Sequence, residues 1–171
     1  MEIAVRDLGG DDVDALQLLL ESDPGYSQRI TGYPTGPSDA LSVLIARPAG
    51  FDEADKFSLG LWADDQLVGF ADLLKGYPDP ETAWIGLLIV DPRQRRVGYG
   101  RALHAAIIDR ASSWPGVRRI LLGIVATNAA YAEPFWRALG YRPTGEVRPY
   151  RYDHVESTVA RWELALGETG R

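Results

Sequence analysis

The chain has 171 residues, of which 46% are hydrophobic and 25% charged, so it is long enough for one domain with a substantial core and too short to favour two. Its formal net charge of −6 argues against a broad nucleic-acid surface, because sequence-independent affinity for phosphate backbones comes from clustered Lys and Arg. The chain contains no cysteine, which excludes disulfides, thiolate metal ligands and a thiol nucleophile.

The first residues lack the basic start and apolar stretch of a secretion signal, and no run approaches the roughly 20 apolar residues of a membrane span. His104 and His154 are too few and too far apart in the sequence to suggest a metal site. We therefore expect one cytoplasmic domain over residues 1–171, with no metal and with neither a nucleic-acid nor a membrane partner.

The N-terminal third predicts a strand and two helices separated by a long loop. Residues 2–8 alternate apolar and polar side chains, as in a half-buried strand. Asp11 or Asp12 can cap a helix that carries an apolar stripe and ends near Ser22. Residues 23–37 contain three prolines and three glycines, which predicts a long loop, and residues 38–47 predict a short helix.

The rest of the chain predicts a mixed sheet. Residues 57–63 and 67–74 are predicted to form a hairpin with a polar turn, and a second turn leads into the apolar strand 84–90. A helix follows from Gly100 to Ala111, and then an apolar strand over 119–126, so these two strands are expected to be parallel. Residues 147–153 and 159–166 are predicted to be the last two strands.

The junction between strand 84–90 and the following helix has the properties of an anion site. The first turn of a helix has unpaired N–H groups and a partial positive charge. Gly98 and Gly100 leave room for a phosphate, and four arginines surround them: Arg93, Arg95, Arg96 and Arg101. A P-loop would need Lys and then Ser or Thr after the last glycine, and a dinucleotide fingerprint would need a third glycine at Leu103. Neither motif is present.

The run from Val90 to Leu103, VDPRQRRVGYGRAL, resembles the acyl-CoA motif Arg/Gln-x-x-Gly-x-Gly/Ala of the GNAT superfamily of N-acyltransferases, with Arg95, Gly98 and Gly100 in the motif positions. The resemblance implies an α/β fold with a central mixed sheet of six to seven strands flanked by helices. It also implies acetyl-CoA as co-substrate, held by residues of the strand, the turn and a later asparagine: Ile89, Val90, Arg95, Arg96, Val97, Gly98, Tyr99, Gly100, Arg101 and Asn128.

A second segment, residues 128–141, resembles the family helix that ends in Leu-Gly-Phe/Tyr. One extra residue and Pro134 predict a late helix start or a bulge. Family members often carry a tyrosine that protonates the departing thiolate, where this chain has Trp136, whose indole cannot act as an acid near neutral pH. Tyr131 is a candidate substitute. The alternative needs no side-chain acid, because water or the ammonium product can protonate the thiolate.

These features predict an N-acetyltransferase that moves an acetyl group from acetyl-CoA directly to a primary amine in a ternary complex. Main-chain N–H groups released by a bulge near residues 88–90 would polarise the thioester carbonyl. Asp72 or Glu81 is the candidate proton relay, because both lie near predicted strand ends that face the expected cleft, although either can be a solvated acid. Tyr26 and Tyr33 are candidates for the acceptor wall, against ordinary loop packing.

Two other classes of function remain open at this point. A GNAT-like module that binds or senses acyl-CoA without transferring the acyl group would keep the same phosphate motif, and Trp136 favours this alternative. A nucleotide-binding protein of a different α/β fold would require the glycine pair to be accidental. The acceptor is equally open among small amines, peptide N-termini, antibiotics and protein lysines, because fold does not identify substrate. A homodimer through the terminal strands is a further expectation.

Overall fold

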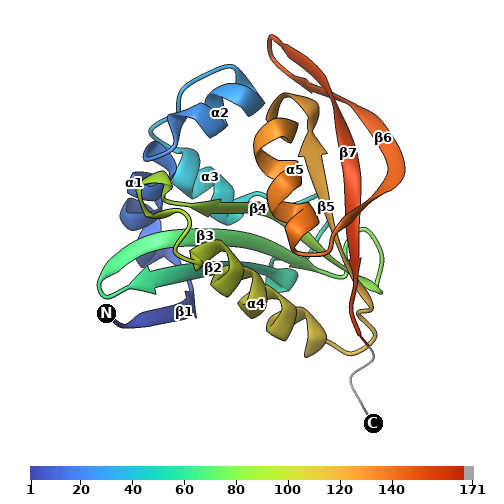
Figure 1. The fold of residues 1–171 in the computed structure, drawn as a ribbon, viewed down its shortest axis with the longest axis horizontal. Coiled ribbons are helices and arrows are strands. Elements are labelled where there is room, and N and C mark those ends of the chain that lie inside the picture. Colours follow the sequence, from blue (N-terminus) through green and yellow to red (C-terminus); the bar gives the residue numbers. More distant parts are fainter. Residues whose placement is uncertain (168–171) are drawn as a thin grey trace.

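The computed structural model describes residues 1–167 and is built on a seven-stranded sheet with the order β1-β2-β3-β4-β5-β7-β6 (Figure 1). All neighbouring strands are antiparallel except the central pair β4 and β5, which are parallel. This arrangement confirms the predicted mixed sheet. The strands are β1 (Ile3–Asp7), β2 (Lys56–Ala63), β3 (Gln66–Lys75), β4 (Thr82–Val90), β5 (Arg119–Val125), β6 (Arg142–Tyr152) and β7 (Val155–Ala165).

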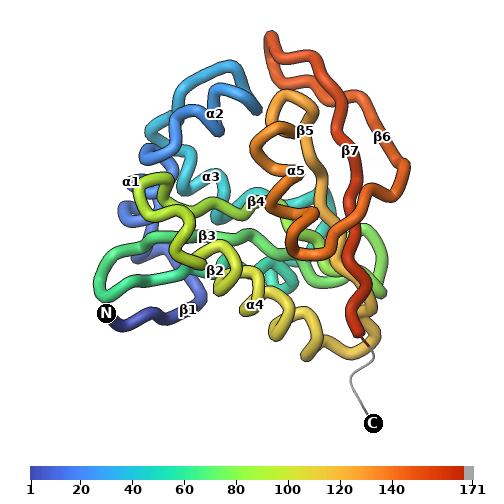
Figure 2. Tube along the Cα trace, viewed as in Figure 1, coloured from blue at the N-terminus to red at the C-terminus, as the bar shows by residue number. Residues whose placement is uncertain are grey.

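Five helices cover the sheet: α1 (Val13–Glu21), α2 (Pro24–Thr31), α3 (Asp39–Ile45), α4 (Tyr99–Ser112) and α5 (Ala129–Ala138). Helices α1 and α3 bury Leu16 and Ala40 against Phe70 of β3 in one core cluster. Helix α4 buries Leu103 and Ile107 in a second, larger cluster. The trace in Figure 2 shows the N-terminal helices on one side of the molecule and α5 with β5 to β7 on the other. The core is therefore divided between the two faces of the sheet.

The apolar segments of the sequence became the central elements as predicted. Asp91 and Pro92 end β4, because the Asp91 side chain accepts a hydrogen bond from the main-chain N–H of Arg93 and caps a 3-10 turn. The predicted hairpin of β2 and β3 is also present. Strand β4, however, is not covered by side chains along its whole length, since Leu87 and Leu88 remain half-buried. The second half of β4 instead lines open space.

Two irregularities open the centre of the sheet. The β3–β4 register passes from Asp72 opposite Leu87 to Leu73 opposite Ile85, so Gly86 is the extra residue of a β-bulge. On the other side of β4, the parallel pairing with β5 ends at Ile85 and Leu122. Within residues 1–167, β4 beyond Ile85 pairs only with β3, so β4 and β5 separate and expose one edge of β4. The predicted bulge near residues 88–90 is thus wrong in position, by two residues or more.

The prediction that residues 23–37 form a loop is wrong, because α2 occupies Pro24 to Thr31. The side chain of Asp23 accepts a hydrogen bond from the Tyr26 N–H, Pro24 stands in the first turn, and Gly32 ends the helix with a left-handed φ of 79°. These are the positions at which helices favour Asp, Pro and Gly. The high content of proline and glycine therefore suggested a loop, whereas the positions of Pro24 and Gly32 at the two ends of the segment are those typical of a helix.

The prediction of a late start or bulge in α5 is also wrong. The helix begins at Ala129, directly after a 3-10 turn, and contains Pro134 in its interior. Proline removes one intrahelical hydrogen bond. Phe135 and Trp136, which follow it, pack into the larger core cluster, and this burial holds the helix in place. The last two strands are longer than predicted and form a hairpin that turns at Asp153 and His154.

Candidate active site

A cavity of about 770 Å³ lies where β4 and β5 separate, a size typical of ligand pockets. Its walls come from the exposed edge of β4, the turn before α4, helix α2 and helix α5. All of the predicted coenzyme-binding residues except Val97 line it: Ile89, Val90, Arg95, Arg96, Gly98, Tyr99, Gly100, Arg101 and Asn128. The side chain of Val97 is instead 64% exposed. We call this space the larger cavity.

The turn before α4 leaves open space at Gly98. Gly98 is the N-cap of α4 with a φ of 92°, a left-handed conformation that favours glycine, and a Cβ added there would meet no atom within 4 Å. The second glycine has a different role, because a Cβ at Gly100 would lie 2.9 Å from the ring of Phe135. Gly98 therefore leaves room for a ligand, whereas Gly100 allows α4 and α5 to approach each other.

Three of the four arginines of the turn line the larger cavity, namely Arg95, Arg96 and Arg101. The fourth, Arg93, turns away and pairs with the buried carboxylate of Asp91 at 2.6 Å. The Arg93 guanidinium holds the pKa of Asp91 below its usual value of 3.8. The positive charge of the cavity therefore comes from the other three arginines and from Arg29 of α2, which sequence analysis missed.

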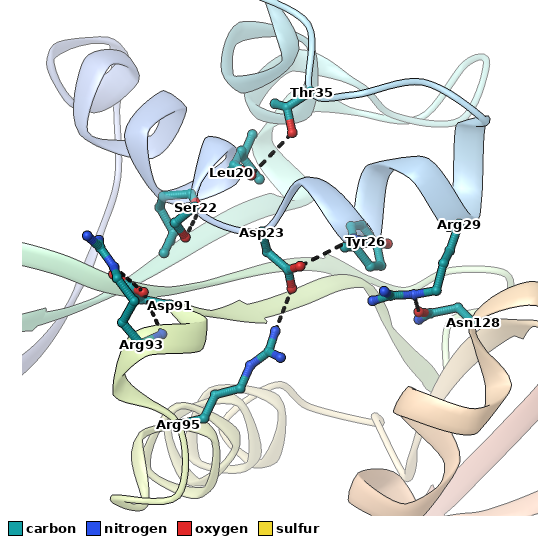
Figure 3. A network of polar contacts seen from close by, with 11 residues as sticks. Leu20, Ser22, Asp23, Tyr26, Arg29, Thr35, Asp91, Arg93, Arg95 and Asn128 are labelled. Carbon is teal, nitrogen blue, oxygen red and sulfur yellow. Dashed lines mark hydrogen bonds and ion pairs between the residues drawn. The ribbon is translucent and has the colours of Figure 1, made fainter.

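Helix α2 lines the larger cavity and is tied both to the turn before α4 and to the segment just before α5 (Figure 3). At its first turn, Asp23 pairs with Arg95. Near its end, the Arg29 Nε donates a hydrogen bond of 2.7 Å to Asn128 Oδ1, and Thr127 Oγ1 donates one of 2.6 Å to the Arg29 carbonyl. Asn128 therefore lines the larger cavity, and its side-chain amide oxygen is hydrogen-bonded to α2.

Tyr131 and Trp136 both line the larger cavity, but in different environments. The ring of Tyr131 is 65% exposed and stacks beneath the Arg29 guanidinium at 3.8 Å. Trp136 is buried and packs edge to face against Tyr141 and His104. Tyr131 is thus largely exposed to solvent, whereas Trp136 packs in the larger core cluster and forms part of the cavity wall.

The His104 beneath Trp136 makes a testable contribution to stability. Burial lowers its pKa from 6.5 to about 4, and its Nε2 lies 2.9 Å from the Tyr141 hydroxyl. The unfolded chain binds this proton more readily, so stability is lost as the pH falls below 6.5. We expect a loss of about 2 kcal/mol between pH 7 and pH 5, measured by denaturant unfolding. His104→Gln should lose markedly less over this range, and the exposed His154→Gln should lose as much as wild type. An equal loss in His104→Gln would contradict the assignment.

A smaller cavity of about 530 Å³ adjoins the larger one on the other side of β4. The two share lining residues from α2 and β4, among them Tyr26, Gly86 and Leu87. The predicted acceptor residues Tyr26 and Tyr33 both line the smaller cavity. Burial raises the pKa of Tyr26 to about 12, so its phenol stays protonated where the cavities meet.

Asp72 lines the smaller cavity beside the bulge. A Cβ at Gly86 would lie 2.5 Å from Asp72 Oδ2, so the absence of a side chain there lets the carboxylate reach the bulged main chain. Asp72 pairs with Lys56, whose side chain is 4% exposed and which sequence analysis missed. Burial raises the pKa of Asp72 above its usual value, against the lowering effect of Lys56. This is the environment of a carboxylate prepared to take a proton.

Glu81, the alternative proton relay, does not lie in either cavity. It precedes β4 at the end opposite the bulge, its side chain is 65% exposed, and its nearest cation is Arg118 at 3.8 Å. The prediction that it faces the cleft is wrong, because a position near a strand end does not define which end of the sheet it occupies. The structure thus brings together Asp72, Tyr26, Tyr131 and the phosphate motif, and leaves Glu81 out.

Among residues 1–167, no group of three or more His, Asp or Glu side chains is placed to hold a metal ion. In the same part of the chain, no helix is both long and apolar enough to cross a membrane.

The sequence and the fold were compared with known proteins. The profile of the Acetyltransferase (GNAT) family matches residues 17–141. A UPF0039 protein of Schizosaccharomyces pombe is 28% identical over 127 residues, which cover 71% of this chain and 80% of that protein. The ribosomal-protein-S18-alanine N-acetyltransferase of Escherichia coli has a similar structure, with a TM-score of 0.70, 21% identity and coverage of 99% of this chain and 97% of that one. An acetyltransferase of Thermus thermophilus has a TM-score of 0.71, 22% identity and coverage of 97% and 98%.

The mixed sheet, in which the central strands β4 and β5 separate beside a glycine turn, has the α/β fold of these acetyltransferase structures. The chain belongs to the GNAT acetyltransferase family. The resemblance predicted from residues 90–103 and the predicted fold class are both confirmed.

Proposed function

We propose that the protein is an N-acetyltransferase that moves the acetyl group of acetyl-CoA directly to a primary amine. The observation that carries this proposal is the exposed edge of β4, which lies between a cavity lined by four arginines and a cavity that contains the Asp72 carboxylate. A polyanionic donor and a cationic acceptor would meet at this edge.

The larger cavity fits the donor. Arg95, Arg96 and Arg101 and the N-terminus of α4 offer positive charge and N–H groups to the phosphates of coenzyme A, beside the open space at Gly98. The free edge of β4 beyond Ile85 offers main-chain groups to the amide-containing pantetheine arm, as strands do for one another. Acetyl-CoA, when bound, supplies an activated acetyl thioester.

The bulge in β4 supports a location for the reaction beside Gly86. Gly86 interrupts the β3–β4 register, and main-chain N–H groups at such a site are free to stabilise the negative charge that develops on the thioester oxygen. Asp72 lies against the same residue from the side of the smaller cavity. The carbonyl carbon and the attacking amine would therefore meet beside a proton acceptor, which is the main requirement of direct transfer.

The steps balance without a covalent intermediate on the protein. Asp72 takes a proton from the ammonium group, directly or through water, and the neutral nitrogen forms a bond to the carbonyl carbon. The carbon–sulfur bond breaks, and coenzyme A leaves as a thiolate. The nitrogen gives its second proton to water, and the thiolate takes a proton either from water or from Tyr131, which water then reprotonates. The net products are an amide, coenzyme A and one released proton.

Coenzyme A release tests the proposal. Purified protein is mixed with acetyl-CoA, and free thiol is measured with and without amines that differ in size and charge. We expect saturable thiol release that depends on the amine, with the acetylated amine identified by mass spectrometry. Acetyl-CoA binding without release from any amine would favour the module that binds acyl-CoA but does not transfer the acyl group. Tyr131→Phe distinguishes the two proton sources. The kcat of this variant falls if the thiolate takes its proton from the Tyr131 phenol and is unchanged if it takes the proton from water.

A further inference from the structure

The smaller cavity differs from the larger one in charge. The charged side chains on its walls are three carboxylates, Asp23, Asp39 and Asp72. Among the described residues that line it, none is Lys or Arg. Arginines therefore line only the larger cavity, whereas Asp39 and Asp72 line only the smaller one and Asp23 lines both.

The three carboxylates are not equivalent. Asp23 pairs with Arg95, and Asp72 pairs with Lys56, so each faces a cation. Asp39 accepts a hydrogen bond of 2.8 Å from the Gly36 N–H, and no ion pair within residues 1–167 includes it. Asp39 therefore gives the smaller cavity its uncompensated negative charge.

Most of the remaining wall is apolar or aromatic. Helices α1, α2 and α3 contribute Leu20, Ile30 and Val43, the residue after α3 contributes Ala46, and β4 contributes Leu87 and Ile89. Such a lining favours a ligand with an apolar body, whereas the carboxylates favour a cationic head and oppose a carboxylate on the ligand.

Two hydrogen bonds tie α2 and the segment after it, which line the smaller cavity, to the hairpin of β6 and β7. The Tyr33 hydroxyl donates to Asp153 at the turn between β6 and β7, and the Tyr150 hydroxyl donates a hydrogen bond of 2.8 Å to the Ile30 carbonyl. Figure 1 shows the end of α2 close to the tip of this hairpin. Because these links restrict the approach from the side of the hairpin, the site favours a small acceptor over a folded protein or a long peptide.

From these observations, and resting on the proposed function, we infer that the acceptor is a small primary amine with an apolar body and no carboxylate, and that Asp39 is the residue that selects against acceptors carrying one. Amino acids, peptide N-termini and protein lysines are then poor acceptors.

Matched pairs test this class. Rates of coenzyme A release are compared for 2-phenylethylamine and phenylalanine, for isopentylamine and leucine, and for a peptide with a free N-terminus and one lysine. We expect kcat/KM for each amine to exceed that for its amino acid by at least about 30-fold, with the peptide no better than the amino acids. A carboxylate-bearing acceptor or the peptide used as well as the amines would overturn the inference while leaving the acetyltransferase intact. Binding of acetyl-CoA with no turnover of either amine would also overturn it. Absence of acetyl-CoA binding would instead remove the proposed function itself.

Asp39→Asn tests the selecting residue. The amide oxygen still accepts from Gly36, so the loop is kept while the charge is removed. We expect KM for 2-phenylethylamine to rise about three- to tenfold with little change in kcat, and the preference over phenylalanine to narrow by a similar factor. Asp14→Asn, an exposed carboxylate of α1 outside both cavities, should change neither value. An unchanged preference in Asp39→Asn would remove Asp39 from this role.

Discussion

Replacing Asp72 with Asn is expected to lower kcat by about 100-fold or more, with the affinity for acetyl-CoA unchanged, because the variant keeps the shape of the site and loses its proton acceptor. In the structure, this carboxylate lies against Gly86 and lines the cavity assigned to the amine. Steady-state rates with a good amine, together with titration of acetyl-CoA, measure both quantities. Glu81→Gln is the matched control, since Glu81 lies outside both cavities and its loss should leave kcat at the wild-type value.

The pH dependence of this reaction gives a second measurement on Asp72. Its carboxylate must be ionised to accept a proton, and burial raises its pKa above 3.8. Activity of the wild type should therefore fall as the pH decreases through a pKa higher than that of an ordinary aspartate. Lys56→Met removes the cation that opposes this shift, so the acid limb should move to still higher pH. If the acid limb of Lys56→Met lay at the same pH as that of the wild type, Lys56 would not be the group that lowers the pKa of Asp72.

Stability must be separated from catalysis in these variants. The Lys56 side chain is almost fully buried and pairs with Asp72. Asp72→Asn leaves the Lys56 charge buried without a partner, which is expected to lower the free energy of unfolding by about 3 kcal/mol. The double variant with Lys56→Met and Asp72→Asn removes both charges and should recover stability. If it also recovered activity, Asp72 would be a structural residue and not the base.

Replacing Gly98 with Glu is expected to weaken acetyl-CoA binding by about 100-fold or more, because the new carboxylate would enter the larger cavity where the phosphates are assigned. No atom lies within 4 Å of the added Cβ, so the side chain fits without displacing the core. The left-handed φ of 92° adds a backbone cost of about 1–2 kcal/mol to folding. Isothermal titration and thermal unfolding measure the two effects separately.

Gly145→Glu is the control for that backbone cost. Gly145 has a φ of 91°, a Cβ there would also meet nothing within 4 Å, and the residue lines neither cavity. It should therefore lose about as much stability as Gly98→Glu and keep wild-type affinity for acetyl-CoA. Equal losses of affinity in the two variants would mean that strain or net charge, and not the site, explains the effect.

Local patterns predicted the frame of this fold and a set of residues that share the larger cavity. Apolar runs defined β4 and β5, because strands at the centre of a mixed sheet are buried by helices on both faces. The residues of the glycine turn are contiguous in sequence, so their common place in the larger cavity follows from one strand, one turn and one helix. Only Val97, whose side chain faces solvent, departs from the predicted set.

The rest of the candidate site depends on residues that meet only in the folded chain. The bulge at Gly86 follows from its packing against Asp72 of another strand. An isolated glycine within an apolar strand is a local signal for a bulge, and the prediction at residues 88–90 overlooked it. Lys56 reaches Asp72 from a third strand, and Arg29 reaches Asn128 across 99 residues. Arg29 was missed for a further reason, since α2 itself was predicted as a loop from its prolines and glycines.

Isothermal titration of the wild-type protein with acetyl-CoA, followed by addition of an amine to the complex, tests the central claim most directly. The account predicts saturable binding at one site per chain, loss of that binding in Gly98→Glu but not in Gly145→Glu, and coenzyme A release only after the amine is added. No binding by the wild-type protein, or equal binding by Gly98→Glu, would contradict the assignment of the larger cavity to acetyl-CoA.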